Sequence, residues 1–247
     1  MGAPNKLAHG LVKARRSVVH VGDVMRRRRQ GAALLENSNW GTFIDQASGY
    51  RTFNPNTFPM ASAAVAASLR IFESKGGIEG LTRGKKPFFT NILDAHDVEE
   101  HPALLDLILS PEIVEPVTGY FGTLPRLKCM GVFVSAANDS TESSQLFHVD
   151  NDDFRQIKCF INLVETGPGQ GPFTFLPAQS TATALSALGH SWGFGRFSDE
   201  EVASVTNMSE SIALTGGMGS GAFVDTSRCL HYGSRARQGY RLVLMFN

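Results

Sequence analysis

The amino-acid sequence predicts a mainly β fold with flanking helices, built around a jelly-roll, cupin-like double-stranded β-helix. Two observations predict this class. From Leu127 onward the chain breaks into short apolar runs separated by glycine and proline, which is typical of antiparallel sandwiches and barrels. Before that point, apolar residues recur at helical spacing, which predicts a layer of helices. The chain has 247 residues and neither a linker nor a repeat separates the halves, so we expect one domain over residues 41–247.

Helices are expected in the first half of this domain, at about residues 59–122. Residues 61–74 are alanine-rich and carry apolar side chains at helical spacing. Residues 102–109 and 111–120 each begin with a proline in the first turn of a helix, where the missing N–H costs little. We expect Pro116 to bend the last of these helices or to end it early.

The β-helix core is expected over about residues 127–247. One helix interrupts it, because Ser198 and Glu201 form a capping box that opens a helix running to about Met208. Six strands are predicted around that helix, at residues 127–135, 157–164, 172–177, 211–215, 221–225 and 240–246.

Residues 1–40 form a basic N-terminal extension in front of the domain. The extension holds eight lysines and arginines against two acidic residues, which gives it a net charge of +6. Because the whole chain has a formal net charge of zero, the rest carries −6, and this charge disfavours nucleic acid as a partner. A targeting segment, an electrostatic tether and a solvated, partly helical segment are all consistent with the extension.

Cysteine use and hydropathy indicate a reducing compartment, with the cytoplasm as the expected location. Cys129, Cys159 and Cys229 are odd in number and widely spaced, so they suit neither a disulfide framework nor a zinc site, and we expect small buried thiols. The apolar runs are shorter than the about 20 residues of a membrane span, and no signal peptide is expected. An organellar location is the alternative, if the basic extension is a targeting segment.

Two histidines and an aspartate are the candidate metal ligands. His148 and Asp150 are separated by one residue, and His231 follows eighty-three residues after His148. Two histidines with one carboxylate are the ligand set of non-haem Fe(II) sites with open coordination positions. A strand end would let His148 and Asp150 bend toward one point, and His231 lies in a separate strand candidate. The open alternatives are a surface pair for the first two and a hydrogen-bonded core histidine for the third.

Arg241 is the candidate anchor for an anionic cosubstrate. In the last predicted strand it shares one face with Val243 and Met245, so it points toward apolar surroundings. An arginine that points into a core needs an anion, and its planar fork matches a carboxylate. This position suits a dicarboxylate cosubstrate. Arg237, four residues earlier in a turn-like stretch, is expected to face solvent.

These motifs also resemble a known family. The run Gln145-Leu-Phe-His148-Val-Asp150 is similar to the Q-x-W-H-x-D run of the phytanoyl-CoA dioxygenase family of Fe(II)/2-oxoglutarate oxygenases. The family's terminal pattern of histidine, Gly-Ser and a later arginine appears here as His231, Gly233-Ser234 and Arg241. The resemblance extends from about residue 102 to residue 247.

The resemblance implies an activity and a role for each motif residue. The two histidines and Asp150 would bind Fe(II), and Arg241 would bind the far carboxylate of 2-oxoglutarate. Ser234 and Gln145 would be further cosubstrate-binding residues, and Gln145 and Asp152 are candidates, by proximity in sequence, to support the ligands. 2-Oxoglutarate and O2 would be consumed to hydroxylate a C–H bond of a small or medium-sized organic molecule, with release of succinate and CO2.

Three departures from the family pattern fall near the site. Phe147 replaces the usual tryptophan, Pro177-Ala-Gln-Ser180 stands where Pro-Gly-Ser-His is common, and Tyr232 is inserted before Gly233. None of them removes a metal ligand. The presence of Asp150 also argues against the related halogenases, which lack this carboxylate.

Two other functions remain open at this point. One is a non-catalytic protein that keeps the barrel and binds a metal or ligand, because a fold does not fix a function. The other is a zinc hydrolase that uses the same three ligands. The sequence does not indicate the substrate or the oligomeric state, and we expect loops around residues 78–100 and 178–196 to form the entrance.

Overall fold

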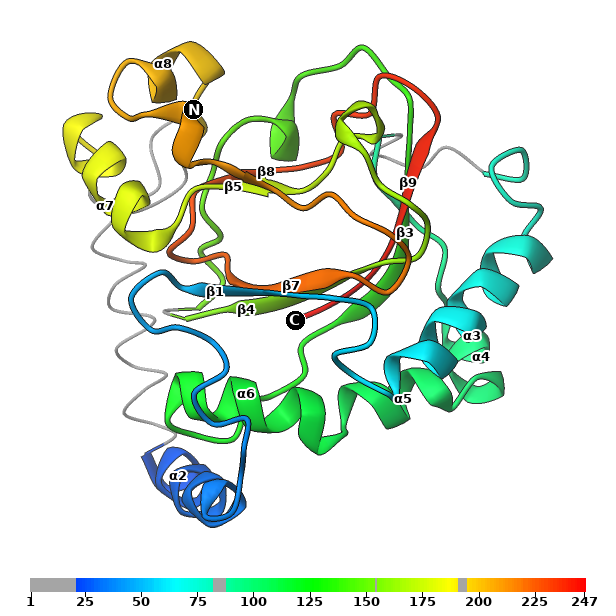
Figure 1. Cartoon of the computed structure of the whole chain (residues 1–247), viewed down its shortest axis with the longest axis vertical. Helices are drawn as coiled ribbons and strands as arrows, with labels where there is room; N and C mark the ends of the chain where they lie inside the picture. Colours follow the sequence, from blue (N-terminus) through cyan, green and yellow to red (C-terminus); the bar gives the residue numbers. More distant parts are fainter. Residues whose placement is uncertain (1–20, 82–87, 154, 191–194) are drawn as a thin grey trace.

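The computed structural model describes residues 21–81, 88–153, 155–190 and 195–247 (Figure 1). The helices are α2 (Val21–Leu35), α3 (Ala61–Ser74), α4 (Ala95–Glu100), α5 (Ala103–Ile108), α6 (Pro111–Phe121), α7 (Ala178–Ala187) and α8 (Asp199–Ala203). The strands are β1 (Tyr50–Phe53), β2 (Thr90–Asn91), β3 (Met130–Ala136), β4 (Ile157–Asn162), β5 (Thr174–Phe175), β6 (Ile212–Ala213), β7 (Gly221–Asp225), β8 (His231–Tyr232) and β9 (Tyr240–Phe246).

The strands form two antiparallel sheets that face each other (Figure 1). The large sheet has the order β1-β7-β4-β9-β3-β2, and the small sheet has the order β6-β5-β8. Side chains of both sheets pack together in the space between them. The members of this inner core are Phe160, Phe173, Phe175, Ala178, Leu214, Ala222, Val224, Cys229, Val243 and Met245. The structure is therefore rich in antiparallel sheet with flanking helices, as predicted, whereas the cupin-like double-stranded β-helix stays a prediction.

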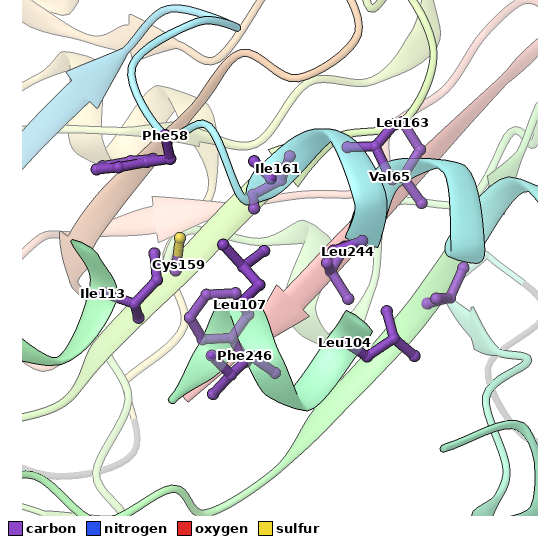
Figure 2. Close-up of a cluster of buried hydrophobic side chains, with 14 of the residues drawn as sticks. Phe58, Val65, Leu104, Leu107, Ile113, Cys159, Ile161, Leu163, Leu244 and Phe246 are labelled. Atoms are coloured by element: carbon purple, nitrogen blue, oxygen red, sulfur yellow. The ribbon is translucent and has the colours of Figure 1, made fainter. Parts of the chain in front are cut away.

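The outer face of the large sheet packs against a helical layer of α3, α5 and α6, which lies on the side away from the small sheet (Figure 1). On β9, Leu242, Leu244 and Phe246 face this layer, whereas Val243 and Met245 face the inner core. The alternation follows from the two-residue period of a strand. Figure 2 shows Leu244 and Phe246 of β9 among side chains of the helical layer.

Most predicted elements form, with two corrections. The α3 helix has the predicted bounds. The α6 helix does not end at Pro116 but continues to Phe121. Proline removes one helical hydrogen bond, and the burial of Pro116 and its neighbours against the sheet offsets that loss. The capping box of Ser198 and Glu201 is present, but α8 ends at Ala203, and a 3-10 turn follows at Met208–Glu210.

The described part of the basic extension lies against the domain. The α2 helix contacts α6, and the Arg27 guanidinium donates to the carbonyl oxygen of Leu124 at 2.8 Å. Gly31 permits this close approach, because a Cβ atom there would lie 3.0 Å from the Leu124 nitrogen. The first twenty residues, with half of the extension's basic side chains, lie outside the described residues.

Two further predictions can be compared with the structure. Cys159 and Cys229 are buried thiols as predicted, but Cys129 is exposed, because it precedes β3 instead of lying within it. No helix in the described ranges is long and apolar enough to cross a membrane.

Candidate metal centre

Three side chains from two distant stretches of chain meet between the sheets. His148 and His231 form an antiparallel bridge in which each backbone N–H donates to the other's carbonyl oxygen at 2.9 Å. Asp150 is two residues further along and points the same way as His148. One candidate ligand atom from each residue lies within 4.8 Å of the others. These three residues, called the triad below, can therefore hold one metal ion.

Backbone carbonyl groups fix the orientation of both imidazoles. Nδ1 of His148 lies 2.8 Å from the carbonyl oxygen of Leu146, and Nδ1 of His231 lies 2.8 Å from that of Cys229. A carbonyl oxygen can only accept, so each Nδ1 carries the proton and each Nε2 keeps a free lone pair. This is the usual arrangement around a metal-binding histidine.

The surroundings keep both imidazoles neutral and the Asp150 carboxyl ionised at neutral pH. Burial, and then the proximity of His148, lowers the pKa of His231 to about 3. Burial also lowers the pKa of His148. Burial alone would raise the pKa of Asp150, but His231 and Lys158 hold it well below its usual range. The atoms that bind a metal must be deprotonated. The triad can therefore bind a cation at neutral pH without first losing a proton.

The Asp150 carboxylate is held from the large sheet. Lys158 of β4 places its Nζ 2.7 Å from Oδ2, and Gln156 donates to the same oxygen at 3.4 Å. The backbone N–H of Asp150 donates to the carbonyl oxygen of Thr226 at 2.8 Å. The predicted support from Asp152 is wrong, because that side chain is exposed and pairs with Lys128.

Arg241 begins the inner face of β9 and is almost fully buried, with 2% of its surface exposed. It lies directly opposite Ser135 of β3. Its Nε has no hydrogen-bond partner, and no carboxylate of the described residues forms an ion pair with it. Burial alone lowers its pKa to about 10. A guanidinium that is buried without a counterion costs free energy, so this geometry fits an anionic ligand that reaches the inner core.

Arg237 provides the contrast. It is exposed and donates to the carbonyl oxygen of Asn138 at 2.9 Å. The prediction that Arg237 faces solvent is confirmed.

Ser234 contacts Ser135, the residue opposite Arg241, and Gln145 supports Ser234. Ser234 is buried in the left-handed region, with φ of 65°, and its hydroxyl lies 3.1 Å from that of Ser135, the residue opposite Arg241. Gln145 is fully buried, and its Nε2 donates to the carbonyl oxygen of Ser234 and to Asn138, each at 2.9 Å. Because the Gln145 amide is occupied by the protein, its geometry favours support of the Ser234 turn over direct contact with a cosubstrate.

The predicted entrance segment from residue 178 to residue 196 is not a simple loop. Its first part is α7, and residues 191–194 lie outside the described residues. Beside α7 a cavity of about 590 Å³ is lined by Val149, Leu185 and Arg228, among others. None of the triad lines it, so it adjoins the ligand segment without including the ligands.

Lys158 is the residue of the site that the sequence interpretation missed. A signal was present, because Ile157-Lys-Cys-Phe-Ile-Asn162 places one lysine in an otherwise apolar or small run. A lysine within a buried strand needs a partner, and Asp150 lies eight residues before it. Only the strand register shows that both side chains face the inner core.

Comparisons with known proteins place the fold. No protein-family model matches the chain, and no curated protein matches it. Among solved structures, the non-haem α-ketoglutarate-dependent carbocyclase SnoK from nogalamycin biosynthesis superposes with a TM-score of 0.54 at 15% identity, covering 86% of this chain and 84% of that chain. The epimerase SnoN in complex with Fe3+, α-ketoglutarate and nogalamycin RO gives 0.52 at 18%, covering 87% and 82%. EctD from S. alaskensis with bound Fe gives 0.54 at 12%, covering 88% and 74%.

The chain has the fold of these enzymes. α-Ketoglutarate is another name for 2-oxoglutarate, so SnoK and SnoN depend on the cosubstrate that the sequence motifs predicted for this chain. At these identities the likeness shows the fold alone. The narrower resemblance to the phytanoyl-CoA dioxygenase family stays a prediction.

Proposed function

We propose that the protein is an Fe(II)- and 2-oxoglutarate-dependent dioxygenase that hydroxylates a C–H bond of a small or medium-sized organic molecule, with release of succinate and CO2. One observation carries the proposal: a triad of two neutral histidines and a carboxylate shares the inner core with a buried arginine that forms no ion pair with the described residues. The triad suits iron with open coordination positions, and the arginine suits the far carboxylate of 2-oxoglutarate. The neighbours' fold and the phytanoyl-CoA dioxygenase-like motifs support the same reading.

Each residue of the site has a defined task in this proposal. His148, Asp150 and His231 hold the iron, and the hydrogen bonds at Nδ1 keep both imidazoles turned toward it. Arg241 orients the cosubstrate by a bidentate contact, with the Ser234 hydroxyl beside it. When bound, iron and 2-oxoglutarate supply the oxidising chemistry.

Apolar side chains of the inner core lie around the buried His231. Phe173 lies with its ring centroid 5.1 Å from that of His231 and stacks on Phe160 at 4.1 Å. Val243 and Met245 complete the apolar lining on the Arg241 face of β9. A water-excluding site strengthens the pairing of Arg241 with a carboxylate and limits side reactions.

An anaerobic titration tests the proposal. Fe(II) added to the full chain is expected to bind at one equivalent, and 2-oxoglutarate is then expected to produce a weak visible charge-transfer band. Admission of O2 is expected to convert 2-oxoglutarate to succinate. Metal binding without the band or succinate would favour a non-catalytic binding protein, and zinc-dependent hydrolysis without a response to 2-oxoglutarate would favour a hydrolase. The Asp150→Ala variant serves as the inactive control.

A further inference from the structure

Lys158 is a second cation in the inner core, and the proposed iron and cosubstrate chemistry does not use it. On β4, Ile157, Cys159 and Ile161 face the helical layer, so Lys158 and Phe160 face the small sheet. The ammonium lies 2.7 Å from Asp150 Oδ2, and only 19% of the Lys158 side chain is exposed. Within the described ranges, Asp150 is the sole carboxylate that forms an ion pair with Lys158.

The charges of the site do not balance once its proposed ligands are counted. In a metal-bound site the two histidines are neutral and Asp150 carries one negative charge, because ligands must be deprotonated to bind. Lys158, which lies 2.7 Å from Asp150, and Arg241 each carry one positive charge. Fe(II) and the 2-oxoglutarate dianion cancel each other. One positive charge remains on side chains that are mostly buried, and such a charge is costly unless an anion matches it.

The unmatched charge belongs to Lys158. The planar guanidinium of Arg241 suits the far carboxylate of the cosubstrate. The oxygen that Lys158 contacts, Asp150 Oδ2, is also the one that lies 3.8 Å from His231 Nε2, on the metal-binding side of the triad. A metal ion held there draws on the same carboxylate, so the ammonium loses most of the charge of the one carboxylate that it pairs with among the described residues.

The inner-facing cations contrast with the charge of the rest of the domain. Residues 41–247 as a whole carry −6, whereas Lys158 and Arg241 are both cations on strands that border the inner core. The local field attracts an anion that the rest of the surface does not.

We propose that the substrate is a small organic anion, and that Lys158 binds its carboxylate beside the metal. The inference rests on the proposed function and adds the substrate class to it. A lysine suits this task because its ammonium is a compact charge with three donors on a flexible stem, so it can exchange Asp150 for the incoming carboxylate. Neutral analogues of the same shape would leave the ammonium unmatched and bind more weakly.

Matched probes on metal-substituted protein test the inference without turnover. The full chain is loaded with Co(II), whose visible spectrum reports ligand changes, and then saturated with 2-oxoglutarate. Phenylacetate and hexanoate are titrated against phenylacetamide and hexanamide, and phenyl phosphate against phenol tests whether a phosphate ester is the better anion. We expect the carboxylates to bind about tenfold or more tightly than their amides, as one charge-assisted hydrogen bond predicts.

Three variants assign the preference to its residue. Lys158→Met is expected to remove the preference for the carboxylates, and Lys158→Arg to keep part of it. Lys128→Met is the matched control, because Lys128 also pairs with an aspartate but on the surface, with 53% of its side chain exposed. That variant is expected to behave like the wild type.

The outcomes separate the inference from the proposed function. Failure of the wild type to bind Co(II), or to respond to 2-oxoglutarate, would overturn the proposed function and the inference with it. Normal Co(II) and 2-oxoglutarate binding with no preference for any anion, or a preference that survives Lys158→Met, would overturn the inference alone. A loss of 2-oxoglutarate affinity in Lys158→Met as large as that in Arg241→Met would make Lys158 a cosubstrate anchor and would also overturn it.

Discussion

The large sheet and the small sheet differ in length, burial and task. In the large sheet, β3 and β9 run for seven residues each and pair along their whole length, with the helical layer on one face and the inner core on the other. In the small sheet, β5, β6 and β8 have two residues each. Long, doubly covered strands supply most of the buried apolar surface, so the stability of the fold depends mainly on the large sheet.

The chemistry is divided between the sheets in a different way. The two inner cations, Lys158 and Arg241, stand on long strands of the large sheet. The triad is held by the short β8 and by the His148–His231 bridge beside it. The cations that orient anions therefore stand on the stable large sheet. The metal ligands lie on or beside short strand pairings, which a bound metal ion would stabilise.

The largest expected effect is on metal affinity when a ligand is removed from the small sheet. His231→Ala is expected to weaken Fe(II) by more than the about 10- to 100-fold that loss of a mere supporting partner costs. Calorimetric titration measures it, and His96→Ala, which removes an exposed histidine on α4, is the matched control. Stoichiometric metal binding by His231→Ala would contradict the triad.

Arg241→Met is expected to change two quantities in opposite directions. 2-Oxoglutarate affinity should fall by about 30-fold or more, because loss of one partner of a buried charge pair costs at least about 2 kcal/mol. The ligand-free protein should become more stable, because a buried charge without a counterion is removed. Arg241→Lys should restore only part of the affinity. If Arg237→Met instead weakened 2-oxoglutarate, the assignment of the anchor would be wrong.

The free energy of unfolding of the metal-free protein should decrease as the pH is lowered, because the buried histidines become protonated more readily in the unfolded state. The pKa of His231 is lowered to about 3 and that of His148 is also lowered, so the folded state resists protonation. Their stabilisation is complete above the unfolded pKa of 6.5 and is lost as the pH falls from there toward the folded values. We expect His231 to contribute a loss of about 1 kcal/mol between about pH 7 and pH 5.5, and His148 to add to it in the same direction. Urea denaturation in the presence of a chelator measures it, and an equal slope in His231→Asn would refute the assignment.

A conservative change in the large sheet should affect stability alone. Ile161 of β4 is fully buried against the helical layer, on the face away from Lys158. Ile161→Val is expected to lower the free energy of unfolding by about 1 kcal/mol through the lost methylene group. Metal and 2-oxoglutarate affinities should stay at the wild-type values. A fall in metal affinity in this variant would mean that the two sheets are coupled more tightly than their contacts indicate.

The two sheets also differ in how far the sequence predicted them. Long apolar runs identified β3, β4, β7 and β9, and helical spacing identified α3, because those signals are local. The four-residue β1 was missed, since its pairing of Tyr50 with Val224 joins residues far apart in sequence. The α7 helix was expected to be a loop because its run of alanine, serine and threonine has a weak apolar face.

For the site, residue types and spacing predicted the ligand set and the arginine, but not what surrounds them. The motif led to His148, Asp150, His231 and Arg241, which the structure places around one inner core. The support of Asp150 by Lys158 could not be predicted, because it depends on which face of β4 the lysine occupies. A shift of one residue in register would turn Lys158 toward the helices instead.

The smallest expected effect at the site comes from removal of the basic extension. Deletion of residues 1–40 takes away α2, whose described contacts are with α6 and the Leu124 turn on the far side of the helical layer from the triad. Metal and 2-oxoglutarate affinities should therefore remain unchanged, while the lost contacts of Gly31 and Arg27 lower thermal stability. Deletion of residues 1–20 alone, which leaves α2 in place, is the matched control and should preserve stability as well. If the longer deletion abolished 2-oxoglutarate turnover in a protein that still bound metal and remained folded, residues 1–40 would take part in the active site. The domain would then begin before residue 41, and the division of tasks between the two sheets would need a third contributor.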